Sequence, residues 1–421
     1  MIDWRQYIKP MLAGEELKEA LRDFPLYDDS IRSVDEASRL MALSDIYKVY
    51  VPSIMAMEIY HKLYLAMLMS LQKKETKAAM QQQKHNYLGM RGSEFRGIIG
   101  GSDSFTIIGK SGIGKSSAIE RAVALITDDK IIQIESPRIT VIPILQVQCP
   151  YDSSSKSLLL SILQAVDERI GSNYYKSGTR AGVTTDALIG LVSQVCLNSI
   201  GVLIIDEIQN VVKSKKGGLL IGMLMQLINS SGISIAMVGT PESAIFFESE
   251  MQLARRSLGL KYNALDYDEN FIEICQYLFH YQYTKHRTEL SEELISWLYE
   301  HSQGVVALLV ALLHDAQEIA IINGSEKVDK NSLSTAYQER MGMLHDRINC
   351  NNKRKSQTTN NRKNKPIVVD NVETIPDEID HWLMWWHFVK RMSWMLFRKY
   401  LKGYRWRWLA YDYIFSRTIY R

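Results

Sequence analysis

Cysteine is scarce in this sequence and is widely spread. Four of the 421 residues are cysteines, and no two of them form a C-x-x-C pair: Cys149, Cys196, Cys275 and Cys350. This spacing argues against a zinc site and against a small scaffold held together by disulfides. Isolated cysteines fit a reducing compartment, so we expect a cytoplasmic protein.

Long hydrophobic runs are also lacking. The N-terminus, residues 1–5, has no apolar core of the kind that a secretory signal contains. The most apolar early stretch is residues 54–71, and it includes Glu58, His61 and Lys62. Polar groups at that density disfavour a membrane span, so we expect a buried helix there and no membrane partner.

An overall excess of one charge is lacking too, but the charges are unevenly placed. The formal net charge is +3, whereas residues 351–421 carry 15 lysines and arginines against six acidic residues. The apolar fraction of 46% and the charged fraction of 23% are ordinary for a soluble globular protein, and the length predicts two or three domains. The basic C-terminal end is the part that could bind an anionic polymer.

A glycine-rich stretch carries the strongest functional signal. Residues 109–116 match the phosphate-binding pattern G-x-x-x-x-G-K-[ST], between a predicted strand at 105–108 and a predicted helix at 117–126. In such a loop, successive N–H groups point at phosphate oxygens, and the helix N-terminus adds partial positive charge. We predict that Lys115 reaches the β- and γ-phosphates of ATP and that the Ser116 hydroxyl holds Mg²⁺. The predicted nucleotide-binding residues are Gly109, Lys110, Ser111, Gly112, Ile113, Gly114, Lys115, Ser116 and Ser117.

A second motif follows at residues 202–207. Four apolar residues, 202–205, predict a strand buried on both faces, and Asp206 stands at its carboxyl end, where parallel α/β sheets bind ligands. This is a Walker B pattern. Asp206 would support Mg²⁺, directly or through a water, and Glu207 would orient and deprotonate the water that attacks the γ-phosphate.

Two further elements complete the predicted ATP site. Residues 233–240 predict another buried strand, an extra one between the loop strand and the Walker B strand, and its last residue, Thr240, would sense the γ-phosphate. The Thr240 hydroxyl could equally cap the helix that begins near Pro241. Arg255 and Arg256 end the next helical stretch, and either could enter a neighbouring subunit's ATP site as an arginine finger. The alternative is an ordinary surface pair.

The chain divides into five predicted parts. They are an N-terminal arm with helices at 1–85, an α/β nucleotide-binding domain at 86–265 and a helical lid at 266–345, followed by a polar linker at 346–380 and a tail at 381–421. We expect the arm to pack on a neighbour or locally, and the glycine-rich segment 87–101 is of a kind that often lies over adenine. The lid has no arginine directly after Gly304, so a second nucleotide sensor is not expected there. Helices are predicted at 53–84, 154–170, 185–198, 290–299, 305–322 and 332–344, a further strand at 140–147, and a polar loop at 171–180.

The tail leaves its role open. It contains six of the eight tryptophans interleaved with nine cations. Such a mixture could stack on bases, bind phosphates or lie at a membrane interface. It could also be no selected structure, for instance a shifted reading frame.

Taken together, the motifs resemble those of AAA+ ATPases: a P-loop α/β fold with a parallel sheet between helices and a small all-helical lid. Four strings are more specifically similar to the TnsC/TniB group of transposition regulators: residues 147–152, 206–210, 238–241 and 253–256. The resemblance covers residues 85–345.

The family implies an ATPase that assembles as a ring or filament on target double-stranded DNA in the bacterial cytosol and nucleoid. It also implies communication between a target-selector protein and a DDE-type transposase. Two loops are best supplied for DNA contact, 153–157 with Lys156 and 174–180 with Lys176 and Arg180. Alternatively these cations are merely solvated and the tail binds DNA. A helicase loader or replication initiator, or a scaffold ATPase that binds only proteins, would share the two Walker motifs.

Overall fold

The computed structural model describes residues 2–90, 104–135, 139–152, 154–211, 217–244 and 259–341, with the single residues 97 and 99. Residues 1–346 form one compact unit, and residues 347–421 lie outside the described ranges. The predicted linker at 346–380 and the predicted tail at 381–421 therefore lie outside the described residues.

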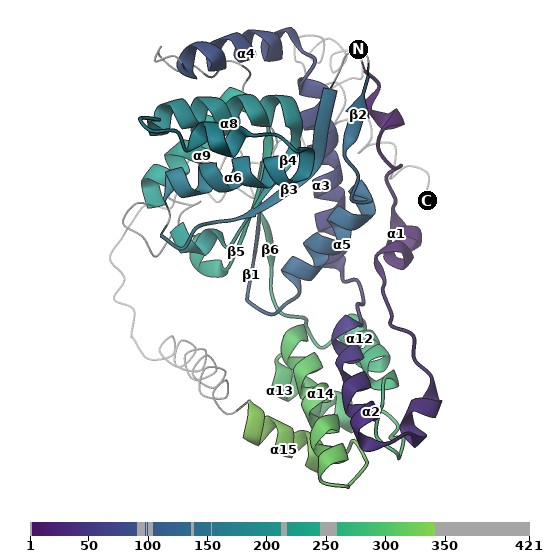
Figure 1. Ribbon diagram of the computed structural model, residues 1–421. Coiled ribbons are helices and arrows are strands. Elements are labelled where there is room, and N and C mark those ends of the chain that lie inside the picture. The colour runs from purple at the N-terminus through teal and green to yellow at the C-terminus, as the bar shows by residue number, and fades with distance from the viewer. Residues whose placement is uncertain are drawn as a thin grey trace, which may run out of the picture. The chain divides into compact units, whose positions relative to one another are not determined.

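A six-stranded sheet lies at the centre of the first unit (Figure 1). Its order is β2–β3–β4–β5–β1–β6, and all neighbours are parallel except β2 and β3. The extra strand expected between the loop strand and the Walker B strand is confirmed as β5. The strands are β1 Phe105–Gly109, β2 Ile132–Ile134, β3 Ile139–Gln148, β4 Ile200–Asp206, β5 Ser234–Gly239 and β6 Leu260–Tyr262.

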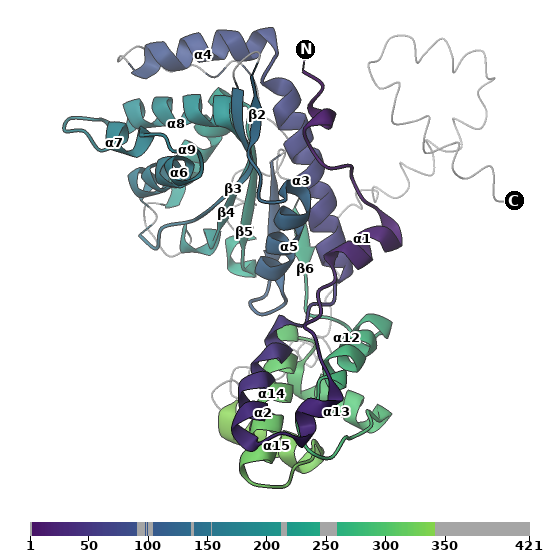
Figure 2. The same ribbon diagram turned by 45° about the vertical axis from the view of Figure 1, so that its right-hand side comes forward.

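Helices cover both faces of the sheet, as Figures 1 and 2 show. One face packs against α1 (Gly14–Leu21), α3 (Ile54–Lys73) and α5 (Lys115–Thr127). The opposite face packs against α6 (Ser155–Ile170), α8 (Thr185–Ser199) and α9 (Gly217–Ser231). Burial on both faces explains why every residue of β1, β4 and β5 is buried. The predicted P-loop α/β fold is confirmed.

Several local predictions need correction. Residues 53–84, expected to be helical, form two helices, α3 and α4 (Lys77–Met90), and α4 extends beyond the expected end. The loop expected at 171–180 contains a short helix, α7 (Tyr174–Gly178). The strand expected at 140–147 begins one residue earlier, at Ile139, and Pro143 within it lies beyond residues 139–141, which pair with β2.

A helical bundle follows the sheet, as predicted for the lid. It consists of α12 (Glu269–His280), α13 (Glu292–Ser302), α14 (Val306–Ile322) and α15 (Lys330–Arg340). The sequence reading missed α12, although the Asp268 cap and the buried Phe271, Ile274, Cys275 and Leu278 have helical spacing. No single described helix is long and apolar enough to cross a membrane; α13 and α14 pass that test only together, across a bend of 119°.

The N-terminal segment, residues 2–53, packs partly on the sheet domain and partly on the helical bundle of its own chain. Its first part, with η1 (Trp4–Gln6) and α1, joins the core on the face of the sheet that α3 and α5 cover. Its second part, with η2 (Asp29–Ser33), α2 (Glu36–Ala42) and η3 (Leu43–Lys48), joins the core of the bundle. There the buried Arg39 guanidinium pairs with both Glu326 carboxylate oxygens at 2.6 Å. The segment thus connects the sheet to the bundle.

Candidate functional site

The phosphate-binding loop lies between β1 and α5, the context that its motif requires. Gly112 and Gly114 have φ of +81° and +94°, which glycine adopts without strain. The Lys115 ammonium donates to the carbonyls of Gly109 at 2.7 Å and Lys110 at 2.8 Å. Burial lowers the pKa of Lys115, while Asp206, Glu207 and Glu242 oppose that shift. The loop therefore holds a cation facing the acidic end of β4.

The Walker B residues are at the carboxyl end of β4, beside that loop. Asp206 is 9% exposed, and its Oδ1 accepts the Glu207 N–H at 2.7 Å. Ser116 is in the first turn of α5. A cavity of about 830 Å³ is lined by Lys115, Ser116, Asp206 and Glu207 together. The structure thus gathers hydroxyl, carboxylate and ammonium groups around one space, although they come from two separate motifs.

Glu207 and Thr240 are joined by a side chain that sequence reasoning did not single out. Glu207 has φ +58°, a left-handed conformation that is uncommon for residues other than glycine. The Gln209 amide donates to the Glu207 carboxylate, and Gln209 Oε1 accepts the Thr240 N–H at 3.3 Å. Thr240 precedes η5 (Pro241–Ser243), but its side chain forms no capping bond to this turn.

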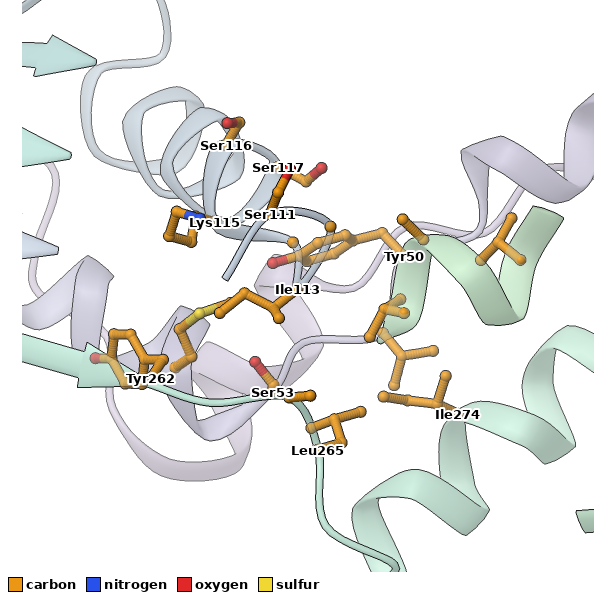
Figure 3. A pocket seen from close by; sticks show the side chains of 18 of the residues that line it. Tyr50, Ser53, Ser111, Ile113, Lys115, Ser116, Ser117, Tyr262, Leu265 and Ile274 are labelled. Carbon is orange, nitrogen blue, oxygen red and sulfur yellow. The ribbon is translucent and has the colours of Figure 1, made fainter. Parts of the chain in front are cut away.

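Apolar side chains line much of the other end of the cavity, and they come from elements that the sequence did not indicate. Figure 3 shows Tyr50 and Ser53 of the N-terminal segment near the loop residues, with Leu265 from the segment before α12 and Ile274 from α12 itself. Val306 of α14 lines the same end. Among the described residues of segment 87–101, none lines the cavity. Such an apolar wall suits a flat aromatic base better than a polar wall would.

Tyr50 is held on two sides. Its main chain pairs with Asp23, with hydrogen bonds of 2.8 and 3.1 Å. The Arg121 guanidinium, from α5, lies 5.4 Å from the ring centroid and also pairs with the Asp23 carboxylate. Burial raises the pKa of Tyr50. No sequence signal linked these three residues, because they are brought together only by the packing of the N-terminal segment on α5.

The bundle touches the phosphate-binding loop through its backbone. The Ala307 N–H donates to the Gly112 carbonyl at 3.0 Å. A Cβ on Gly112 would lie 3.0 Å from Val305 Cγ1, so a larger residue would crowd the bundle as well as strain the backbone. Gly304 has φ +69°, and a Cβ there would meet the Leu265 carbonyl oxygen at 1.9 Å. Within the described ranges, the bundle contributes no lysine or arginine to the cavity lining.

The predicted DNA loops are both described, apart from Ser153. Lys156, Lys176 and Arg180 are exposed. The Asp167 carboxylate accepts the N–H groups of Tyr174 and Tyr175 at 2.8 Å each, which fixes the start of α7.

The direction in which α7 runs along α6 follows from the contacts at its two ends. A Cβ on Gly178, at the end of α7, would contact Leu160 and Leu163 of α6. The first residue of α7 is bonded to Asp167, and its last residue, Gly178, lies against Leu160 and Leu163, so α7 runs back along α6 toward the end that carries Lys156. The loop that carries Lys176 and Arg180 therefore leads back toward Lys156. The two arginines predicted as fingers, Arg255 and Arg256, lie outside the described residues.

Comparisons with known proteins found a matching family model and several similar solved structures. The model of a family described as "Bacterial TniB protein" matches residues 101–261. No curated protein matches the chain. Among solved structures, Aeropyrum pernix Orc1 in complex with DNA is similar at 17% identity and TM-score 0.41, over 62% of this chain and 63% of that chain. Domain III of Thermotoga maritima DnaA is similar at 14% identity and TM-score 0.35, over 63% and 92%.

The family match spans both Walker motifs and the strand that carries Thr240. It agrees with the resemblance that the strings at 147–152, 206–210 and 238–241 indicate. Residues 101–261 of this chain are thus similar to the TniB family, and the sheet that they contribute to has the P-loop α/β fold described above.

Proposed function

We propose that this protein is an ATP-dependent regulator of DNA transposition. It assembles on target double-stranded DNA and links a target-selector protein to a DDE-type transposase, with ATP hydrolysis as the switch. One observation carries the ATPase part: Lys115, Ser116, Asp206 and Glu207 line a single cavity. The TniB family match supports the transposition part.

The donor set fits ATP with Mg²⁺. The Ser116 hydroxyl and the Asp206 carboxylate are hard oxygen ligands of the kind that Mg²⁺ prefers, and a bound Mg²⁺ would neutralise charge on the phosphates. The loop N–H groups and Lys115 bind the phosphates. Tyr50 and the apolar side chains at the far end of the cavity bind the base.

Hydrolysis would use Glu207 as the base. Its carboxylate takes a proton from water as the water oxygen bonds to the γ-phosphorus, and the bond from that phosphorus to the bridging oxygen of ADP breaks. Thr240 contacts the γ-phosphate, and Arg255 or Arg256 of a neighbouring subunit completes the site. A homo-oligomer, ring or filament, is therefore part of the proposal.

DNA contact is assigned to Lys156, Lys176 and Arg180. They are exposed, and α7 leads two of them back toward the third. Exposed cations can bind phosphates without reading bases, which suits a protein that binds target DNA of any sequence.

Equilibrium DNA binding tests this function. Fluorescence anisotropy with labelled duplexes of unrelated sequence should show tight binding with ATP and weak binding with ADP, and Lys115→Ala should remove the ATP effect. Affinity purification should recover an integrase-type transposase. DNA binding that ignores the nucleotide would contradict the switch, and recovery of a replicative helicase would favour a helicase loader.

A further inference from the structure

The side-chain amide of Gln209 connects two segments of the candidate hydrolysis site. Its Nε2 donates to Glu207 Oε2, and its Oε1 accepts the main-chain N–H of Thr240 at 3.3 Å. Glu207 follows β4 and Thr240 follows β5, which are adjacent strands. All three residues line the cavity. One amide therefore ties the carboxylate to the end of the neighbouring strand.

The turn that carries Gln209 is fixed by its surroundings. Gln209 belongs to η4 (Ile208–Val211), and the next side chain, Asn210, donates to the Cys149 carbonyl at 3.0 Å. Ile208 is buried in the core on the face of the sheet that α6, α8 and α9 cover. Both neighbours of Gln209 are thus anchored, which limits where its amide can reach.

Gly239 leaves the space that the amide occupies. A Cβ at this position would lie 3.0 Å from Gln209 Oε1 and 2.7 Å from Ile208 Cγ2. Any larger residue at the end of β5 would push the amide away from the Thr240 N–H. The close contact between η4 and the end of β5 therefore depends on glycine at position 239, which has no side chain.

The carboxylate that the amide holds is itself on constrained backbone. Glu207 keeps its left-handed φ of +58° while its N–H is bound to Asp206 Oδ1 at 2.7 Å. Such conformations persist where neighbouring contacts over-determine them. The amide occupies Oε2, and among the described residues Oε1 has no hydrogen-bond partner. One oxygen is held, and the other is left for a water.

We propose that Gln209 is a positioning residue for hydrolysis. It holds Glu207 so that Oε1 takes the proton of the attacking water, and it couples that carboxylate to Thr240, which contacts the γ-phosphate. A shift of the Thr240 backbone then moves the base with it. The inference rests on the proposed role of Glu207 and adds the residue that orients it.

Gln209→Leu tests the inference, because leucine has a similar size and no amide. We expect kcat for ATP hydrolysis to fall about 10- to 100-fold, as a misplaced catalytic group does. The KM and the equilibrium Kd for ATP should stay within about twofold, because the phosphate-binding loop is untouched. Gln209→Glu should lose at least as much kcat, since it places a like charge beside Glu207.

The chain offers a matched control. Gln164 of α6 donates to Glu168 at 3.0 Å on an exposed surface, so Gln164→Leu removes the same type of bond away from the cavity. Its kcat should equal that of the wild type. Circular dichroism and thermal unfolding confirm that each variant is folded before its kinetics are compared.

A double-mutant cycle separates positioning from a general structural role. In a Glu207→Gln background, Gln209→Leu should change single-turnover hydrolysis by less than about twofold, because there is no base left to orient. Equal losses in both backgrounds, or a wild-type kcat for Gln209→Leu, would overturn the positioning role alone. Normal turnover by Glu207→Gln would overturn both this inference and the base assignment beneath it.

Discussion

At the scale of single residues, Glu207 should separate ATP binding from hydrolysis. Glu207→Gln keeps the shape and removes the base, so turnover should fall about 10²- to 10⁴-fold while ATP affinity is retained. The variant should hold its ATP-bound, DNA-bound assembly longer than the wild type does. Single-turnover hydrolysis and dissociation of labelled DNA measure the two effects. Unchanged turnover would move the base to another residue.

Lys74 should make stability depend on pH. Its ammonium donates to the carbonyls of Cys196 and Leu197 at 3.0 and 2.6 Å, and burial lowers the pKa of Lys74 to about 7. Between pH 7 and 10 the unfolded chain thus binds a proton that the folded chain has released. The free energy of unfolding, relative to Lys74→Met, should therefore rise with pH by up to about 1.4 kcal/mol per unit.

Urea unfolding of both proteins at several pH values measures this difference. The exposed Lys77, in the first turn of α4, provides the comparison, and Lys77→Met should show no such slope. A flat difference for Lys74→Met as well would mean that the carbonyls keep the ammonium charged throughout.

At the scale of elements, α7 and the start of α6 should act together on DNA. Lys156→Ala with Lys176→Ala should weaken ATP-dependent binding equally on all sequences. The log–log salt slope should flatten by about 0.9 for each DNA phosphate that the variant no longer neutralises. Anisotropy titrations at several salt concentrations measure both effects. Lys130→Ala, in the exposed turn after α5, should leave the slope unchanged.

A truncated chain that ends near residue 349 is the converse of the double substitution, which changes the loops and keeps the tail. It keeps both loops and removes the basic tail, so it should retain ATP-dependent binding. If the truncation abolishes binding while the double substitution preserves it, the tail is the DNA-binding element.

Elements differ in how far the sequence alone predicts them. β4 and β5 contain apolar runs at 202–205 and 235–238, and α6 and α8 have helical periodicity, so local pattern was enough for each. The start of α7 depends on a carboxylate seven residues earlier, Asp167, and no local pattern announces it. The apolar wall of the cavity was missed for a related reason, since Tyr50 reaches it only through contacts with Asp23 and Arg121.

At the scale of the whole molecule, the proposed finger requires a neighbour. An Arg255→Ala, Arg256→Ala double variant and a Lys115→Ala variant should each be inactive alone. Mixed together, they should regain part of the ATPase activity, because each supplies the half-site that the other lacks. Steady-state hydrolysis across mixing ratios measures the rescue. Mixtures no more active than their components would exclude a finger acting in trans, or show that mixed interfaces do not form.

The Arg39–Glu326 pair has a consequence for how the chain is made. Its partners are 287 residues apart, so a ribosome releases the arginine long before its carboxylate exists. Leu43 and Ile46 likewise await bundle helices that emerge last. Contacts between such distant residues slow folding and expose apolar surface meanwhile. The early segment is thus a natural client for chaperones during synthesis, and residues 266–345 expressed alone would lack part of their own core.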